Sequence, residues 1–388
     1  MDRSLPDPPT AVFLHGILGC RKNWGSFAKR LAREFPMWQF LLVDLRCHGD
    51  SASMKKRGPH TVASAALDVL KLVRDLRITP RVLVGHSFGG KVVLSMVDQA
   101  AKPLARPVRK CRQVDPKDSV RNVGKGPKTP NTGQTAEKCS EQRSKVQKIH
   151  AVACVLAGIV SEGDAIWRDK MHTCGAGADI RGYATWGRSG VEQPLAATEH
   201  AVEELFSVVA KITDAWILDA TPGKVRAGGD GEDHPAELIS LLNTLPKEVS
   251  SKKDVVKALI QQGFSNDVAQ WVVTNLRPTS SPNSRFSWAF DLKGISEMYQ
   301  SYEETNLWKI VEDVPRGVHI NFLKAERSLH RWALEDLQRI HVAEEVASEE
   351  GGGVEMHVLE DAGHWVHTDN PDGLFRILSS SFQGNSRT

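Results

Sequence analysis

The residues that point most directly to chemistry form the motif Gly85–Gly89, Gly-His-Ser-Phe-Gly. A serine hydroxyl is a weak nucleophile near neutral pH and needs an adjacent base. Glycines on both sides of the serine allow a sharp turn that exposes it above a sheet, provided that the turn joins a strand to a helix. Residues 81–85 predict that strand, and Lys91 onward predicts that helix. We therefore predict that Ser87 is a catalytic nucleophile rather than part of a chance glycine-rich turn.

The base for Ser87 is expected late in the chain, because this arrangement runs in the order serine, acid, histidine. Of the 14 histidines, His364 is best placed, since it follows the last predicted strand and precedes the last predicted helix. His367 is interpreted as a packed or solvated loop histidine. His86 adjoins the nucleophile, but we expect it to point away from the turn and to be structural.

The acid that would orient His364 and stabilise its imidazolium has two main candidates. Asp219 ends the predicted strand 215–219, and Glu326 follows the next predicted strand. Chain order permits both; Asp219 is preferred, and it is alternatively explained as a cap for the turn after it. Asp291 and Asp336 are weaker alternatives.

Acyl transfer also requires hydrogen-bond donors for the oxyanion that develops on the substrate. The backbone N–H of Phe88, directly after the nucleophile, is one predicted donor. The second is expected in the loop after the first strand, His15–Gly19, and is assigned to the N–H of Ile17.

The elements that must position these groups alternate between strand and helix over the first 100 residues, which indicates a parallel sheet covered on both faces. Apolar periodicity also predicts short helices between residues 233 and 277 and a final helix over about 371–382. The expected strands and helices, in chain order, are strand 11–15, helix 24–35, strand 40–44, helix 62–76, strand 81–85, a helix from 91, strand 215–219, helices 235–245, 252–262 and 266–276, and strands 318–323 and 354–359.

Charge is unevenly distributed along the 388 residues, whose net charge is +3. Residues 102–148 alone carry a net charge of +9 and contain almost no aromatic residues, which is typical of disorder. A helix is expected over 198–211. None of the six cysteines has a CxxC or metal-like spacing, so they read as free thiols in a reducing compartment.

Four segments together resemble the α/β-hydrolase superfamily, and most closely its small esterases of the bacterial YbfF type and the abhydrolase-domain-eleven type. These segments are His15–Gly19, Asp44–Ser51, Gly85–Lys91 and Gly363–His367. The resemblance covers about residues 1–101 and 215–385. It implies a mostly parallel α/β-hydrolase sheet of six or more strands with helices on both faces. It also implies a helical cap inserted after the strand that follows the nucleophile helix. In YbfF-type esterases the acid follows that same strand, which favours Asp219.

The resulting domain prediction has three parts. The α/β-hydrolase core comprises residues 1–101, 215–221 and 311–388, and the cap comprises 222–310. Residues 102–214 form an atypical basic insertion, read as disordered or as a gene-model artefact rather than as a docking loop. Cap residues of apolar type would line an acyl pocket or form the cap's own core: Leu238, Leu241, Leu242, Val255, Leu259, Trp271 and Val272.

The resemblance implies a serine hydrolase that acts on a small-molecule ester or thioester through an acyl-serine, with catalytic Ser87, Asp219 and His364. No metal, organic cofactor or nucleic-acid partner is implied, and no apolar run is long enough to span a bilayer. The alternatives are a triad-retaining lyase of the menaquinone-pathway type, a cofactor-free haloperoxidase, a receptor-like ligand-binding α/β-hydrolase, or an inactive isoform. The cytoplasm is the default expectation for localisation, because residues 1–10 carry no secretory signal, with a plastid or mitochondrion as the alternative for a truncated start.

Overall fold

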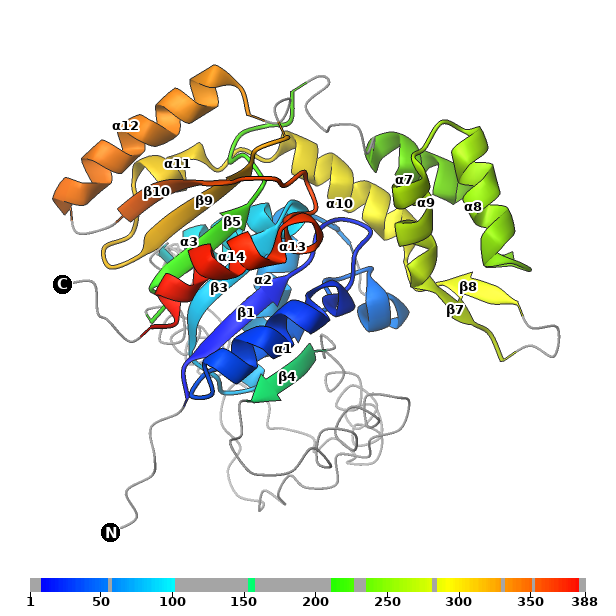
Figure 1. Ribbon diagram of the computed structural model, residues 1–388, viewed down its shortest axis with the longest axis horizontal. Helices are drawn as coiled ribbons and strands as arrows, with labels where there is room; N and C mark the ends of the chain where they lie inside the picture. Colours follow the sequence, from blue (N-terminus) through cyan, green and yellow to red (C-terminus); the bar gives the residue numbers. More distant parts are fainter. Residues whose placement is uncertain are drawn as a thin grey trace, which may run out of the picture. The chain divides into compact units, whose positions relative to one another are not determined.

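A seven-stranded sheet organises the protein in the computed structural model (Figure 1). The structure describes residues 8–54, 58–101, 153–157, 211–226, 235–280, 285–328, 332–350 and 353–383. The strands are β1 (Thr10–Leu14), β2 (Gln39–Val43), β3 (Pro80–His86), β4 (Ala153–Ala157), β5 (Asp214–Leu218), β9 (His319–Ala325) and β10 (Gly353–Leu359).

The strand order of this sheet is β10-β9-β5-β3-β1-β2-β4. The predicted site residues follow the carboxyl ends of its parallel strands. All neighbours are parallel except β4, which pairs antiparallel with β2. β5 pairs with β3 on one side and with β9 on the other, so this strand joins the sheet despite the long insertion before it. His86 in β3 lies opposite Leu218 in β5. Ser87 and Asp219, the next residues, therefore leave neighbouring strands side by side.

Alternate residues of the central strands belong to two separate apolar clusters, one on each face of the sheet. In β1, Val12 and Leu14 face one cluster, whereas Ala11 and Phe13 face the other. A strand buried on both faces must be apolar throughout, which explains the short continuous apolar runs in the sequence. The first cluster is covered by α2 (Val62–Asp75), α3 (Phe88–Ala101), α11 (Trp308–Glu312) and α12 (Leu334–Glu350), and the second by α1 (Gly25–Glu34) and α14 (Pro371–Leu378).

Polar residues fix where several helices begin. The Thr61 hydroxyl accepts the N–H of Ser64 at the start of α2 (3.1 Å), and the Asn370 side chain accepts the N–H of Gly373 at the start of α14 (2.8 Å). Such caps satisfy N–H groups that have no partner inside the helix. The short helices of the core are η1 (Arg21–Trp24), η2 (Gly49–Ser53), α13 (Val366–Asp369) and η5 (Ser379–Ser381).

Between β5 and β9 lies a mainly helical segment, residues 235–280 and 285–304, called the cap below. Its elements are α7 (Pro235–Thr244), β6 (Glu248–Val249), α8 (Lys252–Gln261), α9 (Asn266–Val272), η3 (Val273–Asn275), β7 (Leu276–Pro278), β8 (Phe286–Trp288) and α10 (Leu292–Glu304). β6, β8 and β7 form a small antiparallel sheet. In Figure 1, α10 extends from α7, α8 and α9 toward the large sheet.

The mostly parallel sheet with helices on both faces confirms the predicted fold class. The helix expected over 266–276 is confirmed almost to its end, since α9 (266–272) continues into the 3-10 helix η3 (273–275) before strand β7 begins at Leu276. Pro278 in β7 lacks the N–H that a continuing helix needs. The nucleophile helix begins at Phe88 rather than at Lys91.

Most of the basic insertion predicted for 102–214 lies outside the described residues, as does nearly all of the helix expected over 198–211. Five of its residues, Ala153–Ala157, form β4. Among the helices that the structure describes, none is both long and apolar enough to cross a membrane.

Candidate active site

Ser87 occupies the turn between β3 and α3, with a backbone φ of 53°. This left-handed conformation is costly for a residue with a Cβ, and such strain concentrates at functional sites. The two flanking glycines are required by space. A Cβ on Gly85 would overlap the backbone of Gly89, and a Cβ on Gly89 would lie 2.7 Å from the carbonyl oxygen of His15. The spacing of the motif therefore follows from how closely β3, α3 and the end of β1 approach one another.

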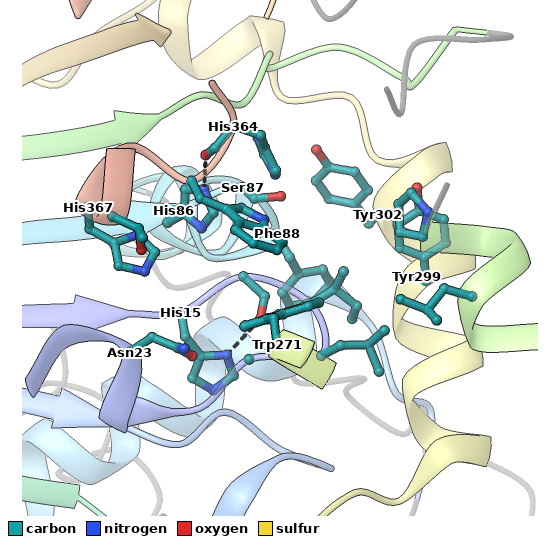
Figure 2. A pocket seen from close by; sticks show the side chains of 18 of the residues that line it. His15, Asn23, His86, Ser87, Phe88, Trp271, Tyr299, Tyr302, His364 and His367 are labelled. Carbon is teal, nitrogen blue, oxygen red and sulfur yellow. Dashed lines mark hydrogen bonds between the residues drawn. The ribbon is translucent and has the colours of Figure 1, made fainter. Parts of the chain in front are cut away.

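The structure brings Asp219 and His364 together. His364 Nδ1 lies 2.7 Å from Asp219 Oδ2, and a carboxylate accepts hydrogen bonds, so Nδ1–H is the donor. That tautomer leaves the lone pair of Nε2 on the remote side of the ring. Ser87 and His364 line the same pocket, and Figure 2 shows them in it with Tyr299 and Tyr302 across from them.

The Asp219 carboxylate is fully buried and accepts three hydrogen bonds besides that of His364. The N–H of Ala325 (3.1 Å) and the indole N–H of Trp332 (3.0 Å) donate to Oδ1, and the Ser328 hydroxyl donates to Oδ2 (2.7 Å). A buried charge is tolerated when it is saturated in this way. Sequence reasoning missed Ser328 and Trp332, because nothing in their spacing relates them to a strand about 110 residues earlier in the chain.

The other candidate acids lie elsewhere. Glu326 is exposed and accepts the N–H of Asp361 (2.8 Å). Asp291 caps α10 by accepting the N–H of Gly294 (3.3 Å), and Asp336 forms an ion pair with Arg226 (3.2 Å). The geometry therefore distinguishes the candidates that chain order left open.

The predicted oxyanion donors belong to two segments that meet at Ser87. A Cβ on Gly16 would lie 3.3 Å from the Cβ of Ser87, so the loop after β1 runs directly beside the nucleophile turn. Ile17 and Phe88 both line the pocket that contains Ser87. Their N–H groups stay predicted donors for an oxyanion.

Two buried histidines fix the backbone of this loop. His15 Nδ1–H donates to the carbonyl of Gly16 (2.7 Å), and its Nε2 accepts the N–H of Leu45 (3.0 Å). His48 Nδ1–H donates to the carbonyl of Arg46 (2.8 Å), and its Nε2 accepts the N–H of Leu18 (3.1 Å). Burial lowers the pKa of His15 to about 4 and that of His48 to about 3, so both rings are neutral near pH 7. Each ring can therefore donate and accept at once.

His86 and His367 pack beside the predicted catalytic histidine. His86 Nε2–H donates to the backbone carbonyl of His364 (2.6 Å), which places the loop that carries His364. Burial, and then the neighbouring rings of His364 and His367, hold the pKa of His86 well below its usual value. The ring of His367 lies tilted against that of Trp24, with ring centres 4.8 Å apart, and burial lowers the pKa of His367 to about 4.

Lys91 links the nucleophile helix to the chain around the cap. It is fully buried, and its Nζ donates to the carbonyl oxygens of Gly223 (2.6 Å), Tyr302 (2.7 Å) and Thr305 (3.2 Å). Its ammonium also lies 4.2 Å from the centre of the Tyr302 ring. Burial lowers the pKa of Lys91 to about 7. Lys91 thus connects α3 to the chain before the cap and to the chain at the end of the cap.

The wall facing Ser87 is apolar and aromatic and comes largely from the cap. Of the seven cap residues considered as pocket lining, Leu238 and Trp271 line the pocket. The others pack in the apolar cluster of the cap and core, which was the alternative expectation. Trp271 contacts Trp365 from the loop after His364, with ring centres 5.3 Å apart. Further apolar or aromatic pocket residues are Ile17, Leu18, Phe88, Tyr299 and Tyr302.

These features define the α/β-hydrolase class. A strained serine lies between a strand and a helix of a mostly parallel sheet, and a histidine in the same pocket donates a hydrogen bond to a buried aspartate. The chain belongs to the alpha/beta hydrolase family, whose model matches residues 11–377. The resemblance to esterases of the abhydrolase-domain-eleven type is confirmed by the relatives described next.

Three relatives are similar in sequence to about a quarter of this chain. The sn-1-specific diacylglycerol lipase ABHD11 of Xenopus tropicalis is 37% identical over 109 residues, which is 27% of this chain and 31% of that protein. A putative esterase/lipase of Haemophilus influenzae is 32% identical over 88 residues, 23% of this chain and 29% of that protein. A 2-succinyl-6-hydroxy-2,4-cyclohexadiene-1-carboxylate synthase of Klebsiella pneumoniae is 31% identical over 102 residues, 26% of this chain and 36% of that protein.

Each of these matches spans about a third of the relative's length. Among solved structures, a marine microorganism esterase aligns with 97% of this chain and 96% of its own, with a TM-score of 0.54 and 15% identity. At that identity the alignment shows a shared fold.

Proposed function

We propose that this protein is a serine hydrolase that cleaves a carboxylic ester or thioester through an acyl-serine intermediate. The observation that carries the proposal is the hydrogen bond from His364 to the buried Asp219, with His364 lining the same pocket as a serine held in the left-handed conformation. A strained serine that lines the same pocket as an oriented imidazole is in keeping with nucleophilic acyl transfer.

In the proposed reaction, Ser87 Oγ attacks the substrate carbonyl carbon while His364 Nε2 takes the hydroxyl proton. His364 then returns this proton to the leaving alkoxide or thiolate as the ester or thioester bond breaks, and the acyl group stays on Ser87. Water, deprotonated by His364, hydrolyses the acyl-serine to release the acid and restore the serine. Asp219 holds the Nδ1–H tautomer and stabilises the imidazolium that forms in each half.

The N–H groups of Ile17 and Phe88 are proposed to bind the negative oxygen of the tetrahedral intermediates. The His15 and His48 hydrogen bonds support this role, because they fix the loop that carries Ile17 before substrate arrives. Donors that need no reorganisation contribute most, and losing one costs about 2.7–4 kcal/mol of transition-state stabilisation.

The apolar wall favours a substrate with a small to medium apolar acyl group. Leu238, Trp271 and the two tyrosines of α10 offer contact area to a hydrocarbon chain near Ser87 (Figure 2). The relatives' names, a diacylglycerol lipase and an esterase/lipase, are in keeping with an acyl ester.

The proposal is tested on the full chain with p-nitrophenyl esters of two, four and eight acyl carbons. We expect hydrolysis of at least one ester, covalent labelling by a fluorophosphonate, and loss of both in Ser87→Ala. Inertness toward both reagents would contradict a serine hydrolase.

The alternatives give different results in the same experiments. A lyase related to the Klebsiella synthase would turn over its own substrate without an acyl-enzyme. A receptor-like protein would bind ligand with very slow turnover. Detection of an acyl-serine by mass spectrometry after rapid quenching would show that esters are hydrolysed through an acyl-enzyme. It would exclude a lyase mechanism for that activity.

A further inference from the structure

Three potential metal ligands meet at the start of α10: Cys47, His60 and Asp291. Cys47 follows β2, His60 precedes α2, and Asp291 is the residue that caps α10. The sulfur of Cys47 lies 3.4 Å from Nδ1 of His60, and the donor atoms of all three residues lie within 4.8 Å of one another. Cys47 and His60 are buried, whereas Asp291 is exposed.

We propose that these three residues bind a divalent transition-metal ion, with Zn²⁺ as the best match. Thiolate, imidazole and carboxylate are the ligands that Zn²⁺ takes, and three protein ligands plus water complete a tetrahedron. Bond lengths of about 2.3 Å to sulfur and about 2.0–2.1 Å to nitrogen imply a sulfur–nitrogen separation of about 3.5 Å. The separation in the structure is close to that value. The exposed carboxylate provides the entry for the ion, and its donor atom lies within 4.8 Å of those of the other two ligands.

The backbone around the cluster holds these groups in place. The N–H of Asp291 donates to the carbonyl of Cys47 (2.9 Å), so the loop after β2 is joined to the start of α10. A Cβ on Gly294 would overlap the Cys47 sulfur, so glycine at this position admits the sulfur to the first turn of the helix. The positive end of a 13-residue helix favours the negative charge of a thiolate ligand.

The consequence is a link between core and cap that lies outside the proposed catalytic groups. Cys47 and His60 belong to the core, and Asp291 starts the helix that carries Tyr299 and Tyr302 into the pocket wall. A bound ion would therefore fix the first turn of α10 to the sheet. The sequence did not suggest this site, because the ligands are separated by 13 and 231 residues.

The test is titration of the metal-free full chain with Co²⁺, followed by Zn²⁺. We expect a thiolate-to-cobalt charge-transfer band that saturates at one equivalent and is displaced by Zn²⁺. At a hundredfold excess of Zn²⁺ over its Kd, the Tm is expected to rise by roughly 5 °C. This readout does not depend on ester hydrolysis, so it stands or falls separately from the proposed function.

Variants assign the ion to the cluster. Cys47→Ser should abolish the band, and His60→Ala should weaken Co²⁺ binding at least tenfold. Asp291→Asn keeps a side chain that caps α10 well but removes the carboxylate, so it should also weaken binding at least tenfold while leaving the metal-free Tm unchanged. Cys20→Ser, a half-buried thiol outside the cluster, is the matched control and should bind like the parent.

Three results would overturn the proposal. The first is a thiolate band that survives Cys47→Ser, which would place the ion on other cysteines. The second is unchanged binding by Asp291→Asn, and the third is the absence of any saturable band in the parent chain. Asp291→Asn decides the question even where Cys47→Ser fails to fold.

Discussion

Two regions line the pocket: the carboxyl edge of the large sheet, and the cap residues opposite it, called the cap wall below. Different interactions hold them together. At the sheet edge, polar groups are saturated: the Asp219 carboxylate accepts four hydrogen bonds, and the rings of His15 and His48 each use both nitrogens. In the cap wall, apolar and aromatic side chains pack against one another without such directional bonds. Saturated buried networks permit one geometry, whereas apolar contacts tolerate repacking.

The contrast indicates a division of work. Changes at the sheet edge should lower kcat, because an interaction made in the transition state is lost. Changes in the cap wall should act on KM and on the choice between acyl groups, since they alter binding that substrate and transition state share. The predictions below test that division.

Replacing the proposed nucleophile should have the largest effect. Ser87→Ala is expected to lower kcat on a p-nitrophenyl ester by about 10⁴–10⁶-fold, because no acyl-enzyme forms. Its Tm should not fall, since alanine meets the same left-handed backbone as serine. Ser95→Ala, at a buried serine of α3, the helix that follows Ser87, is the control and should retain activity. Activity in Ser87→Ala above one-hundredth of the parent's would place the nucleophile elsewhere.

Replacing the proposed acid should have the second largest effect. Asp219→Asn is expected to lower kcat by about 10³–10⁴-fold, because the amide stabilises the wrong tautomer of His364. Glu326→Gln, at the acid that chain order also allowed, should stay within about twofold of the parent. Steady-state kinetics on one ester compare the two variants directly, and the reverse ranking would show that the geometry had been misread.

Acid should weaken the sheet edge through its buried neutral histidines. Their folded pKa values, about 4 for His15 and about 3 for His48, lie below the ~6.5 of an unfolded chain, so the unfolded state takes up protons first as the pH falls. Each ring should therefore remove about 1.4 kcal/mol of unfolding free energy per pH unit from about pH 6.5 down to its folded pKa.

Urea unfolding at pH 7, 6 and 5 measures that slope. His48→Gln should reduce it by about 1.4 kcal/mol per pH unit, since one titrating group is gone. Equal slopes in the parent and in His48→Gln would contradict a neutral buried ring.

In the cap wall, Trp271→Ala should change selectivity rather than chemistry. We expect KM for an eight-carbon acyl ester to rise roughly tenfold, because contact area on the chain is lost, while kcat on the acetate stays within about threefold. Trp288→Ala, at a cap tryptophan outside the pocket lining, is the matched control. A large fall in kcat on the acetate would contradict the expectation that the cap wall acts on KM and selectivity alone.

The smallest effect is expected where the cap and the core meet through charge. Arg277 of β7 forms an ion pair with Asp50, and both side chains are partly exposed. Arg277→Ala should lower the free energy of unfolding by less than about 1 kcal/mol, and the difference should shrink in high salt. Thermal unfolding at low and high salt checks this; a salt-independent loss would indicate packing rather than charge.

Local sequence determined much of the frame. Apolar runs of five residues identified the strands around the nucleophile, since strands buried on both faces must be apolar. The glycines around Ser87 marked a strand-to-helix turn, and His364 could be chosen by its place after the last strand. The same reasoning missed α12, whose apolar residues are diluted by charge, and the two- and three-residue strands of the cap, which are too short to show a period.

The tertiary structure decided which groups meet. Asp219 and Glu326 follow neighbouring strands and looked alike in the sequence, yet the β5–β9 pairing turns Asp219 toward His364 and leaves Glu326 exposed. The cluster of Cys47, His60 and Asp291 is likewise assembled from segments far apart in the chain. The physical reason is that periodicity and turn chemistry act over a few residues, whereas the partner of a buried polar group is set by long-range packing. Ser87 could thus be named from its own motif, but the residues that would make it reactive could be placed only once the sheet had brought them together.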